Sequence, residues 1–171
     1  MDIFQTVVAK ASGITADSAL ASVFSARADL MELTENSHEA SLRPKSPGGL
    51  SHAERAGLAC RMAKLNNDSA LVTHYESLFG DGSQSLADTS FDGGSDARLK
   101  AIIRHTDLIT TKPKEAAAGD VLALQSVGMN DPDIVRLSQL IAFLSYQIRV
   151  VHSLRLMAEV ACVRYSKNSQ R

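Results

Sequence analysis

The chain has 171 residues, of which 18 are basic and 19 are acidic, giving a formal net charge of −1. A chain of this length can form one domain with a substantial core. Because no strong electrostatic field is implied, nucleic acid is a poor candidate partner. We find no stretch approaching the roughly 20 apolar residues that cross a bilayer, and we expect no membrane partner.

The N-terminus and the use of cysteine predict a cytoplasmic, reduced protein. The first ten residues, MDIFQTVVAK, contain an acid at position 2 and no basic segment followed by a long apolar run, so they do not resemble a signal peptide. The two cysteines, Cys60 and Cys162, are far apart in sequence and do not form a disulfide framework.

The composition favours an all-α fold. Aromatic residues make up only 5% of the chain, tryptophan is absent, and no segment shows the sustained alternation typical of strands. Residues 1–43 are predicted to form an N-terminal helical arm, with helices at 2–11, about 16–26 and 26–41. We expect the apolar side of this arm to pack on a helical domain at 50–171, so that the two parts form one structural domain.

A capping box predicts the start of the next helix. Ser51 and Glu54 have the S-x-x-E spacing in which each side chain satisfies a backbone amide of the other residue. Large apolar residues follow on one face of this helix and small residues, including Gly57 and Cys60, on the other, so a neighbouring helix can approach closely. Asp68 is the predicted N-cap of a following helix that ends near Gly80.

The C-terminal half is predicted to contain three helices after a loop at 80–95. Ser95 or Asp96 begins the first, which is interrupted at 111–113, and the second covers about 115–127. The third begins with Asp131 as its cap and Pro132 in its first turn. Its apolar face is unusually wide, which indicates burial inside the domain or between subunits. The face includes Ile134, Leu137, Ile141, Leu144, Ile148 and Val151, with a second stripe at Leu140, Phe143, Val150, Leu154 and Met157.

Two segments resemble the carboxymuconolactone decarboxylase and alkylhydroperoxidase D (AhpD) families, and most closely their peroxidase-related branch. The first is SHAERAGLACRMAKLNNDSALVTHY at 51–75, and the second is GMNDPDIVRLSQLIAFLSYQIRVVHSLRLM at 128–157. The resemblance implies an AhpD-like helical bundle that assembles into homotrimers or homohexamers, with a pocket near the subunit contacts.

The chain departs from the AhpD pattern at the redox centre. That pattern is a glutamate, eleven residues, Cys-x-x-Cys, three residues and a histidine. Counting from Glu54 places the cysteine positions at Asn66 and Ser69 and the histidine position at Thr73, with His74 one residue later. Peroxide reduction in the family needs a vicinal dithiol, because one thiolate attacks and its partner resolves the intermediate. We therefore expect this relay to be absent.

Three hypotheses for function remain open from the sequence. The first is acid–base chemistry on a small organic acid or lactone, with Glu54 and His74 as the catalytic pair. The second is a non-catalytic binding or assembly protein, in which Glu54 is only a helix cap and His74 only a half-buried histidine. The third is a one-cysteine, peroxidase-like oxidoreductase using Cys60, whose pKa Arg55 or Arg61 would lower. The alternative for Cys60 is a small buried packing residue.

Other polar residues are candidates for a pocket. Arg61, Arg149, His152 and Tyr75 are assigned to it, although Tyr75 also fits a core position with its hydroxyl at the surface. His105, His152 and Arg149 either face a common cavity or form a polar edge at an oligomer interface. The scattered histidines lack metal-ligand spacing, so we expect no metal and no cofactor. The expected partners are other copies of the chain and a small organic ligand.

Overall fold

The computed structural model describes the backbone of residues 1–168 and the side chains of residues 1–161. Within this part of the chain every regular element is helical, so the all-α prediction is confirmed. Short 3₁₀ turns lie at Ile3–Gln5 and Pro113–Glu115. The α-helices are α1 (Val7–Ser12), α2 (Ala21–Ser25), α3 (Ala28–Leu42), α4 (His52–Leu65), α5 (Ser69–Glu76), α6 (Ser83–Ala87), α7 (Ala97–Thr111), α8 (Ala118–Ser126) and α9 (Asp131–Asn168).

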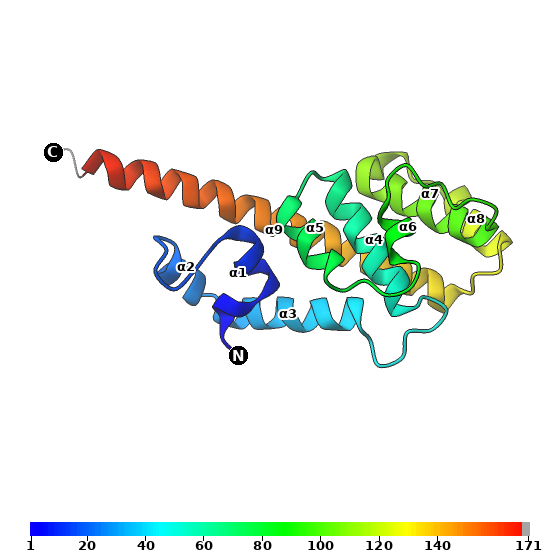
Figure 1. The fold of residues 1–171 in the computed structure, drawn as a ribbon, viewed down its shortest axis with the longest axis horizontal. Helices are drawn as coiled ribbons and strands as arrows, with labels where there is room; N and C mark the ends of the chain where they lie inside the picture. Colours follow the sequence, from blue (N-terminus) through cyan, green and yellow to red (C-terminus); the bar gives the residue numbers. More distant parts are fainter. Residues whose placement is uncertain (169–171) are drawn as a thin grey trace.

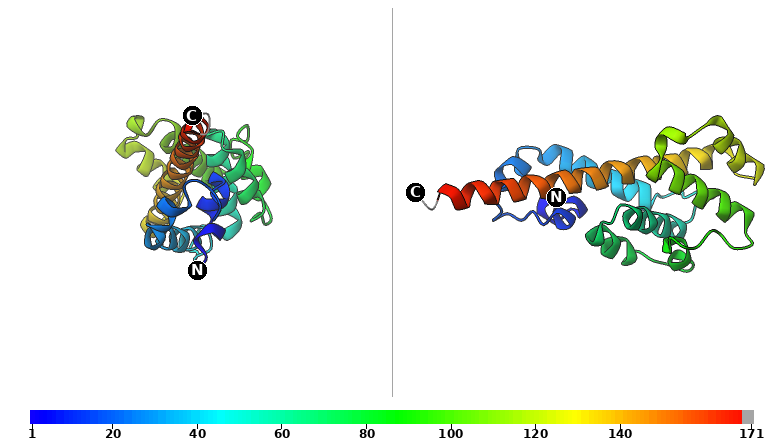
Figure 2. Two further views of the ribbon diagram at one scale, coloured as in Figure 1. Left: turned by 90° about the vertical axis from the view of Figure 1, so that its left-hand side faces the viewer. Right: turned by 90° about the horizontal axis from the view of Figure 1, so that it is seen from above.

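The long helix α9 is the axis of the molecule, and the shorter helices pack along it (Figures 1 and 2). It contacts α1 and α3 on the N-terminal side, α4 in the centre, and α7 and α8 near its own start. Burial confirms the first stripe of its predicted apolar face, whereas in the second stripe Phe143, Val150 and Leu154 are half-buried and Met157 is exposed. The buried residues on it include Ile134, Leu137, Leu140, Ile141, Leu144, Ile148 and Val151.

Helix α9 also corrects the expectation about apolar segments. Residues 131–161 are long and apolar enough, by length and composition alone, to span a membrane. Half of the most apolar window is buried against other parts of the protein, as in the core helix of a globular domain. The apolar character of this segment therefore matches its role as the axis on which the other helices pack.

The cap of α9 differs from the prediction by one residue. The side-chain oxygen of Asn130 accepts a hydrogen bond of 2.9 Å from the amide of Asp133, so Asn130 is the N-cap and Asp131 is already helical. Asn and Asp have nearly equal preference for this position, and Pro132 fits the first turn in either register. The sequence pattern alone therefore does not show whether Asn130 or Asp131 is the N-cap.

The N-terminal helices lie against the rest of the protein. Helix α1 packs against α5 and α9, and α3 packs against α4 and α9. The second helix is shorter than predicted, covering only Ala21–Ser25, because residues 16–20 form turns and a bend. The guanidinium of Arg155 on α9 donates hydrogen bonds of 3.0 and 2.7 Å to the carbonyl of Ala11, which ties the end of α1 to α9.

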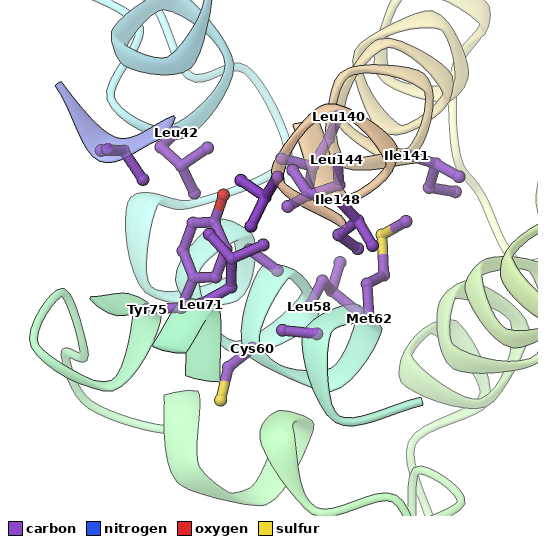
Figure 3. Packing of buried hydrophobic residues seen from close by; sticks show 14 of the residues in the cluster. Leu42, Leu58, Cys60, Met62, Leu71, Tyr75, Leu140, Ile141, Leu144 and Ile148 are labelled. Carbon is purple, nitrogen blue, oxygen red and sulfur yellow. The ribbon is translucent and has the colours of Figure 1, made fainter. Parts of the chain in front are cut away.

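Helix α4 is the central packing element, with neighbours on both faces. Figure 3 shows Leu58 and Met62 pointing toward α9, while Cys60 points to the other side of the helix. On the small-residue face, a Cβ atom at Gly57 would lie 2.7 Å from the carbonyl oxygen of Ser83 and 2.8 Å from Cβ of Leu86. The close approach predicted for this face is thus made by α6. That helix was not predicted, since its sequence lies in the polar loop at 80–95.

Candidate functional site

Glu54 is held by contacts at the start of α4. The amide of Glu54 donates to the hydroxyl of Ser51 at 3.1 Å, and Glu54 Oε2 accepts from the amide of Ser51 at 2.8 Å, which confirms the capping box. The other carboxylate oxygen pairs with the guanidinium of Arg98 on α7, and Arg98 also donates to the carbonyl of Gly49. Both oxygens of Glu54 therefore have structural partners, and the pair with Arg98 connects α4 to α7.

Cys60 is enclosed in the core. Its side chain is 0% exposed, and its sulfur lies 4.0 Å from the carbonyl oxygen of Val72. Burial raises the pKa of the Cys60 thiol to about 11, and the nearby charges are those of Lys64 and Glu76. The predicted activation of this thiol by Arg55 or Arg61 does not match these surroundings. The geometry is that of a packing residue.

Arg61 anchors the polar segment that follows α5. Its guanidinium is buried and forms an ion pair with Asp107 of α7, with contacts of 2.6 and 2.7 Å. It also donates to the carbonyls of Asp88, Thr89 and Phe91. Arg61 is thus committed to protein groups on two elements, and it holds the segment containing α6 against α4 and α7.

Tyr75 is a core residue, but its hydroxyl is not at the surface as the sequence suggested. The side chain is fully buried, and its hydroxyl donates to Oε1 of Gln147, a buried residue of α9. Burial raises the pKa of Tyr75 far above its ordinary value. The phenol therefore stays neutral and connects α5 to α9.

His74 forms a pair with a histidine that the sequence did not single out. Its Nε2 lies 3.1 Å from Nε2 of His38 on α3. His38 is buried, and its Nδ1 lies 3.6 Å from a carboxylate oxygen of Glu39. Burial, followed by the charge of His74, lowers the pKa of His38 to about 4, and burial also lowers the pKa of His74. At neutral pH one imidazole donates and the other accepts.

No sequence signal reveals the His38–His74 pair, because the two residues are 36 positions apart and lie on different helices. Only the tertiary fold, in which α3 and α5 both pack against α4, brings them together. His38 lies on the face of α3 with Thr34 and Leu42, which are also buried. The sequence showed the polar character of α3 but not which of its polar residues face inward.

His152 belongs to an ion-pair cluster around Asp68. Asp68 accepts from the amide of Leu71 at 3.0 Å, which confirms it as the N-cap of α5. Its carboxylate also pairs with Arg155 at 2.8 Å and lies 3.2 Å from Nε2 of His152. Burial raises the pKa of Asp68, but the hydrogen bonds from Arg155 and Leu71 outweigh it, and the net pKa is lowered. The cluster joins α5 to α9.

His105, His152 and Arg149 do not share a cavity, which was one of the two alternatives for them; the other, a polar edge at an oligomer interface, stays a prediction. His105 lines a cavity between α7, α8 and α9 that also includes Asp120. Arg149 lines a shallow hollow on α9, and His152 lies at Asp68. Arg149 and His152 are three residues apart on α9, but their side chains meet different groups: Arg149 lines the hollow, whereas His152 lies beside Asp68.

Glu54, Cys60 and His74 line none of the four cavities that the structure describes, which have volumes of 510, 430, 390 and 210 Å³. Within the same residues, no group of three or more His, Cys, Asp or Glu side chains is arranged to hold a metal ion. The candidate catalytic residues are thus distributed over separate structural contacts: neither the Glu54–His74 pair nor Cys60 faces one of these cavities.

The comparisons with known proteins identify a fold. No protein-family model matches the chain, and no curated protein matches it. Among solved structures it is similar to the crystal structure of an uncharacterized peroxidase-related protein from Silicibacter sp. TM1040. The TM-score is 0.63 with 22% sequence identity, over 80% of this chain and 71% of that chain. The chain therefore shares its all-α fold with that protein.

Proposed function

We propose that this chain is a non-redox protein of the AhpD-like fold that acts through assembly of identical subunits, not through peroxide reduction. The observation that carries the proposal is the state of Cys60, the one cysteine whose side chain lies in the described part of the structure. A peroxidatic thiol is exposed and has a lowered pKa. Cys60 is buried and its pKa is raised, which is the opposite combination.

The contacts of Glu54 and His74 add support. Acid–base catalysis requires both groups to reach the same substrate. The Glu54 carboxylate is engaged by the Ser51 amide and Arg98, whereas the His74 imidazole is engaged by His38. The hypothesis of acid–base chemistry on an organic acid or lactone remains an untested prediction, and these contacts give it no shared site.

The exposed side of α9 offers a surface for assembly. We define the α9 seam as Tyr146, Arg149, Ser153, Leu156 and Val160, which recur at spacings of three and four. Tyr146, Leu156 and Val160 are large and exposed, and a hollow of 390 Å³ lies along the seam near Tyr146 and Arg149. This spacing is the one by which two helices pack side by side in coiled coils.

A second copy of the chain is the proposed occupant of the α9 seam. Exposed apolar side chains that continue along one side of a helix mark interaction surfaces more often than isolated ones do. The C-terminal part of α9 extends beyond the other helices, which leaves it accessible to a partner (Figure 1). The resemblance to a family of trimers and hexamers points to the same kind of partner.

Size-exclusion chromatography with light scattering tests this proposal. We expect the wild-type chain to elute as a homo-oligomer, and Leu156→Lys to weaken association at least tenfold, since it places a charge in the α9 seam. Leu33→Lys on α3 is the matched control, because Leu33 and Leu156 are both 62% exposed. Circular dichroism of each variant checks that the helices are retained. A wild-type chain that stays monomeric at all concentrations would overturn the proposal.

A further inference from the structure

The largest of the described cavities is not lined by Glu54, His74 or Cys60. It has a volume of 510 Å³ and is formed by α3, the segment that follows it, Arg55 of α4 and the first half of α9. Pockets for small ligands fall in the range of about 300–1,000 Å³. Its lining contains two arginines, three serines and a glutamine, with no acidic residue and no lysine.

Arg55 is a buried cation with no anionic partner in this lining. Its side chain is 2% exposed, and its guanidinium donates to the backbone carbonyls of Leu50, Ser41 and Pro47 at 2.9–3.0 Å. Among the ion pairs of the described residues, none involves Arg55. A buried charge without a counter-ion is costly. Burial and the charge of Arg136 lower the pKa of Arg55, although Asp133 and Glu54 act in the opposite direction.

Arg136 brings a second guanidinium to the same cavity. It forms an ion pair of 2.8 Å with Asp133, whose carboxylate also accepts from the amide of Gly49. The charge of Arg136 is therefore balanced within the protein, and the charge of Arg55 is the one left over. One uncompensated positive charge suits a singly charged anion better than a doubly charged one.

The rest of the lining is divided between polar and apolar groups. Ser37, Ser46 and Gln139 supply hydroxyl and amide groups, while Leu140 and Phe143 of α9 supply apolar surface. Guanidinium groups form charge-assisted hydrogen bonds with carboxylates, frequently two at once. A ligand that fits this lining has one carboxylate and an apolar part.

We infer that this cavity binds a small organic monocarboxylate, with its charged group at Arg136 and Arg55 and its apolar part against Leu140 and Phe143. Arg136, with 33% of its side chain exposed, contacts the carboxylate directly. Arg55 contributes mainly its positive charge, because almost none of its surface is accessible. The inference goes beyond assembly through the α9 seam and does not depend on it.

Isothermal titration calorimetry of the full chain with benzoate and hexanoate tests the inference. We expect at least one of them to bind with one site per chain, and the corresponding amide, benzamide or hexanamide, to bind at least tenfold more weakly. Inorganic phosphate serves as the probe for a general anion site and is expected to bind more weakly than the carboxylate.

Two variants locate the binding site. Arg136→Gln removes the contacting charge and is expected to weaken carboxylate binding about tenfold or more, since charge-assisted hydrogen bonds contribute about twice as much as neutral ones. Gln139→Glu places a carboxylate in the cavity at an exposed position and is expected to do the same. The controls are Arg104→Gln and Gln84→Glu, which make the same changes at residues outside the cavity lining.

Four results would overturn the inference. These are no binding of either carboxylate, equal binding of acid and amide, tighter binding of phosphate, and carboxylate binding that neither cavity variant changes. The oligomeric state of each variant is measured as well, so that failure of the binding inference can be distinguished from failure of the assembly proposal. The α9 seam contains neither Arg136 nor Gln139, so these variants should leave assembly unchanged.

Discussion

The surroundings of the Cys60 sulfur determine what chemistry this residue can perform. Thiolates, not thiols, attack electrophiles, and the attacking sulfur must be reached from solvent. Cys60 is 0% exposed, and burial raises its pKa to about 11. A shift of two pKa units from the ordinary value of 9.0 reduces the thiolate fraction at neutral pH about 100-fold, before any steric effect is counted.

We therefore predict that Cys60 is inert to alkylation in the folded protein. In a Cys162→Ser background, iodoacetamide should modify Cys60 at least 100-fold more slowly in buffer than in urea, as followed by mass spectrometry. The background variant removes the second thiol, whose side chain lies outside the described part of the structure. Equal rates in the two conditions would show that Cys60 is accessible in the native state.

The His38–His74 pair predicts a dependence of stability on pH. The pKa of His38 is lowered to about 4 in the folded protein, so the unfolded chain binds more protons between pH 6.5 and 4. The free energy of unfolding should consequently fall as the pH is lowered through this range. One pKa unit corresponds to about 1.4 kcal/mol, so the protonation of His38 should lower the free energy of unfolding by on the order of 3 kcal/mol over this range.

Urea unfolding of the wild type and of His38→Gln at pH 7 and pH 4.5 measures this contribution. The variant should lose less stability than the wild type over that interval. Some dependence should remain, because burial lowers the pKa of His74 and His105 as well. If His38→Gln and the wild type lose the same free energy of unfolding between pH 7 and pH 4.5, His38 is not a source of the pH dependence.

Residue contacts could be predicted from sequence only where they are local. The Ser51–Glu54 box and the Asp68 cap lie within four residues of their partners, so spacing alone reveals them. The contacts of Glu54 with Arg98 and of His74 with His38 join residues 44 and 36 positions apart. Periodicity carries no information about such pairs, so the sequence alone does not show whether Glu54 and His74 share a site.

At the level of elements, the segment that contains α6 depends on one side chain of α4. The composition of residues 80–95 is rich in glycine, serine and aspartate, so the sequence predicted a loop. The guanidinium of Arg61 donates hydrogen bonds to the backbone carbonyls of residues 88, 89 and 91 in this segment, and it pairs with Asp107. With the close approach of α6 to Gly57, this anchoring packs a short polar sequence against the core.

Removing this anchor is expected to be costly. Arg61→Met should reduce the free energy of unfolding in urea by about 3–5 kcal/mol, since it leaves Asp107 and several carbonyls without their cation. It should also speed hydrogen exchange in α6. Asp107→Asn should give a smaller loss with the same local increase in exchange, which keeps the test informative if the arginine variant folds poorly.

The matched control is Arg104→Met on the same helix as Asp107. Arg104 pairs with Asp120 at 2.9 Å, but its side chain is 64% exposed. The Asp120 carboxylate is buried but keeps the amide of Ala117 as a partner, so removing the exposed Arg104 should cost only about 1 kcal/mol. A loss for Arg61→Met no larger than that for Arg104→Met would contradict the anchoring role.

At the scale of the whole molecule, the all-α fold could be predicted from apolar repeats and helix caps, which are visible in a single sequence. The apolar repeat predicted α9, and the caps predicted the starts of α4 and α5. The structure buries the first stripe of α9 and begins α4 and α5 at these caps. The α9 stripe also extends past the body, where Leu156, Met157 and Val160 remain exposed. A repeat alone cannot distinguish residues that face the core from those that face another subunit.

The chain shares an all-α fold with an uncharacterized peroxidase-related protein, and the polar side chains of its 51–75 segment are engaged by other groups of the same chain. Asn66 donates to the carbonyl of Met62, Asp68 pairs with Arg155, and His74 pairs with His38. Each of these side chains stabilises a junction between elements or a helix end. These contacts hold the helices of the segment in place, and the proposed assembly surface lies elsewhere, on the outer side of α9.

A peroxide-consumption assay tests the central claim most directly. Hydrogen peroxide and tert-butyl hydroperoxide are supplied with dithiothreitol as reductant, and the wild type is compared with buffer and with Cys60→Ser and Cys162→Ser. The claim predicts that all three proteins consume peroxide no faster than the reductant alone. Turnover above that background, lost on replacement of either cysteine, would contradict it.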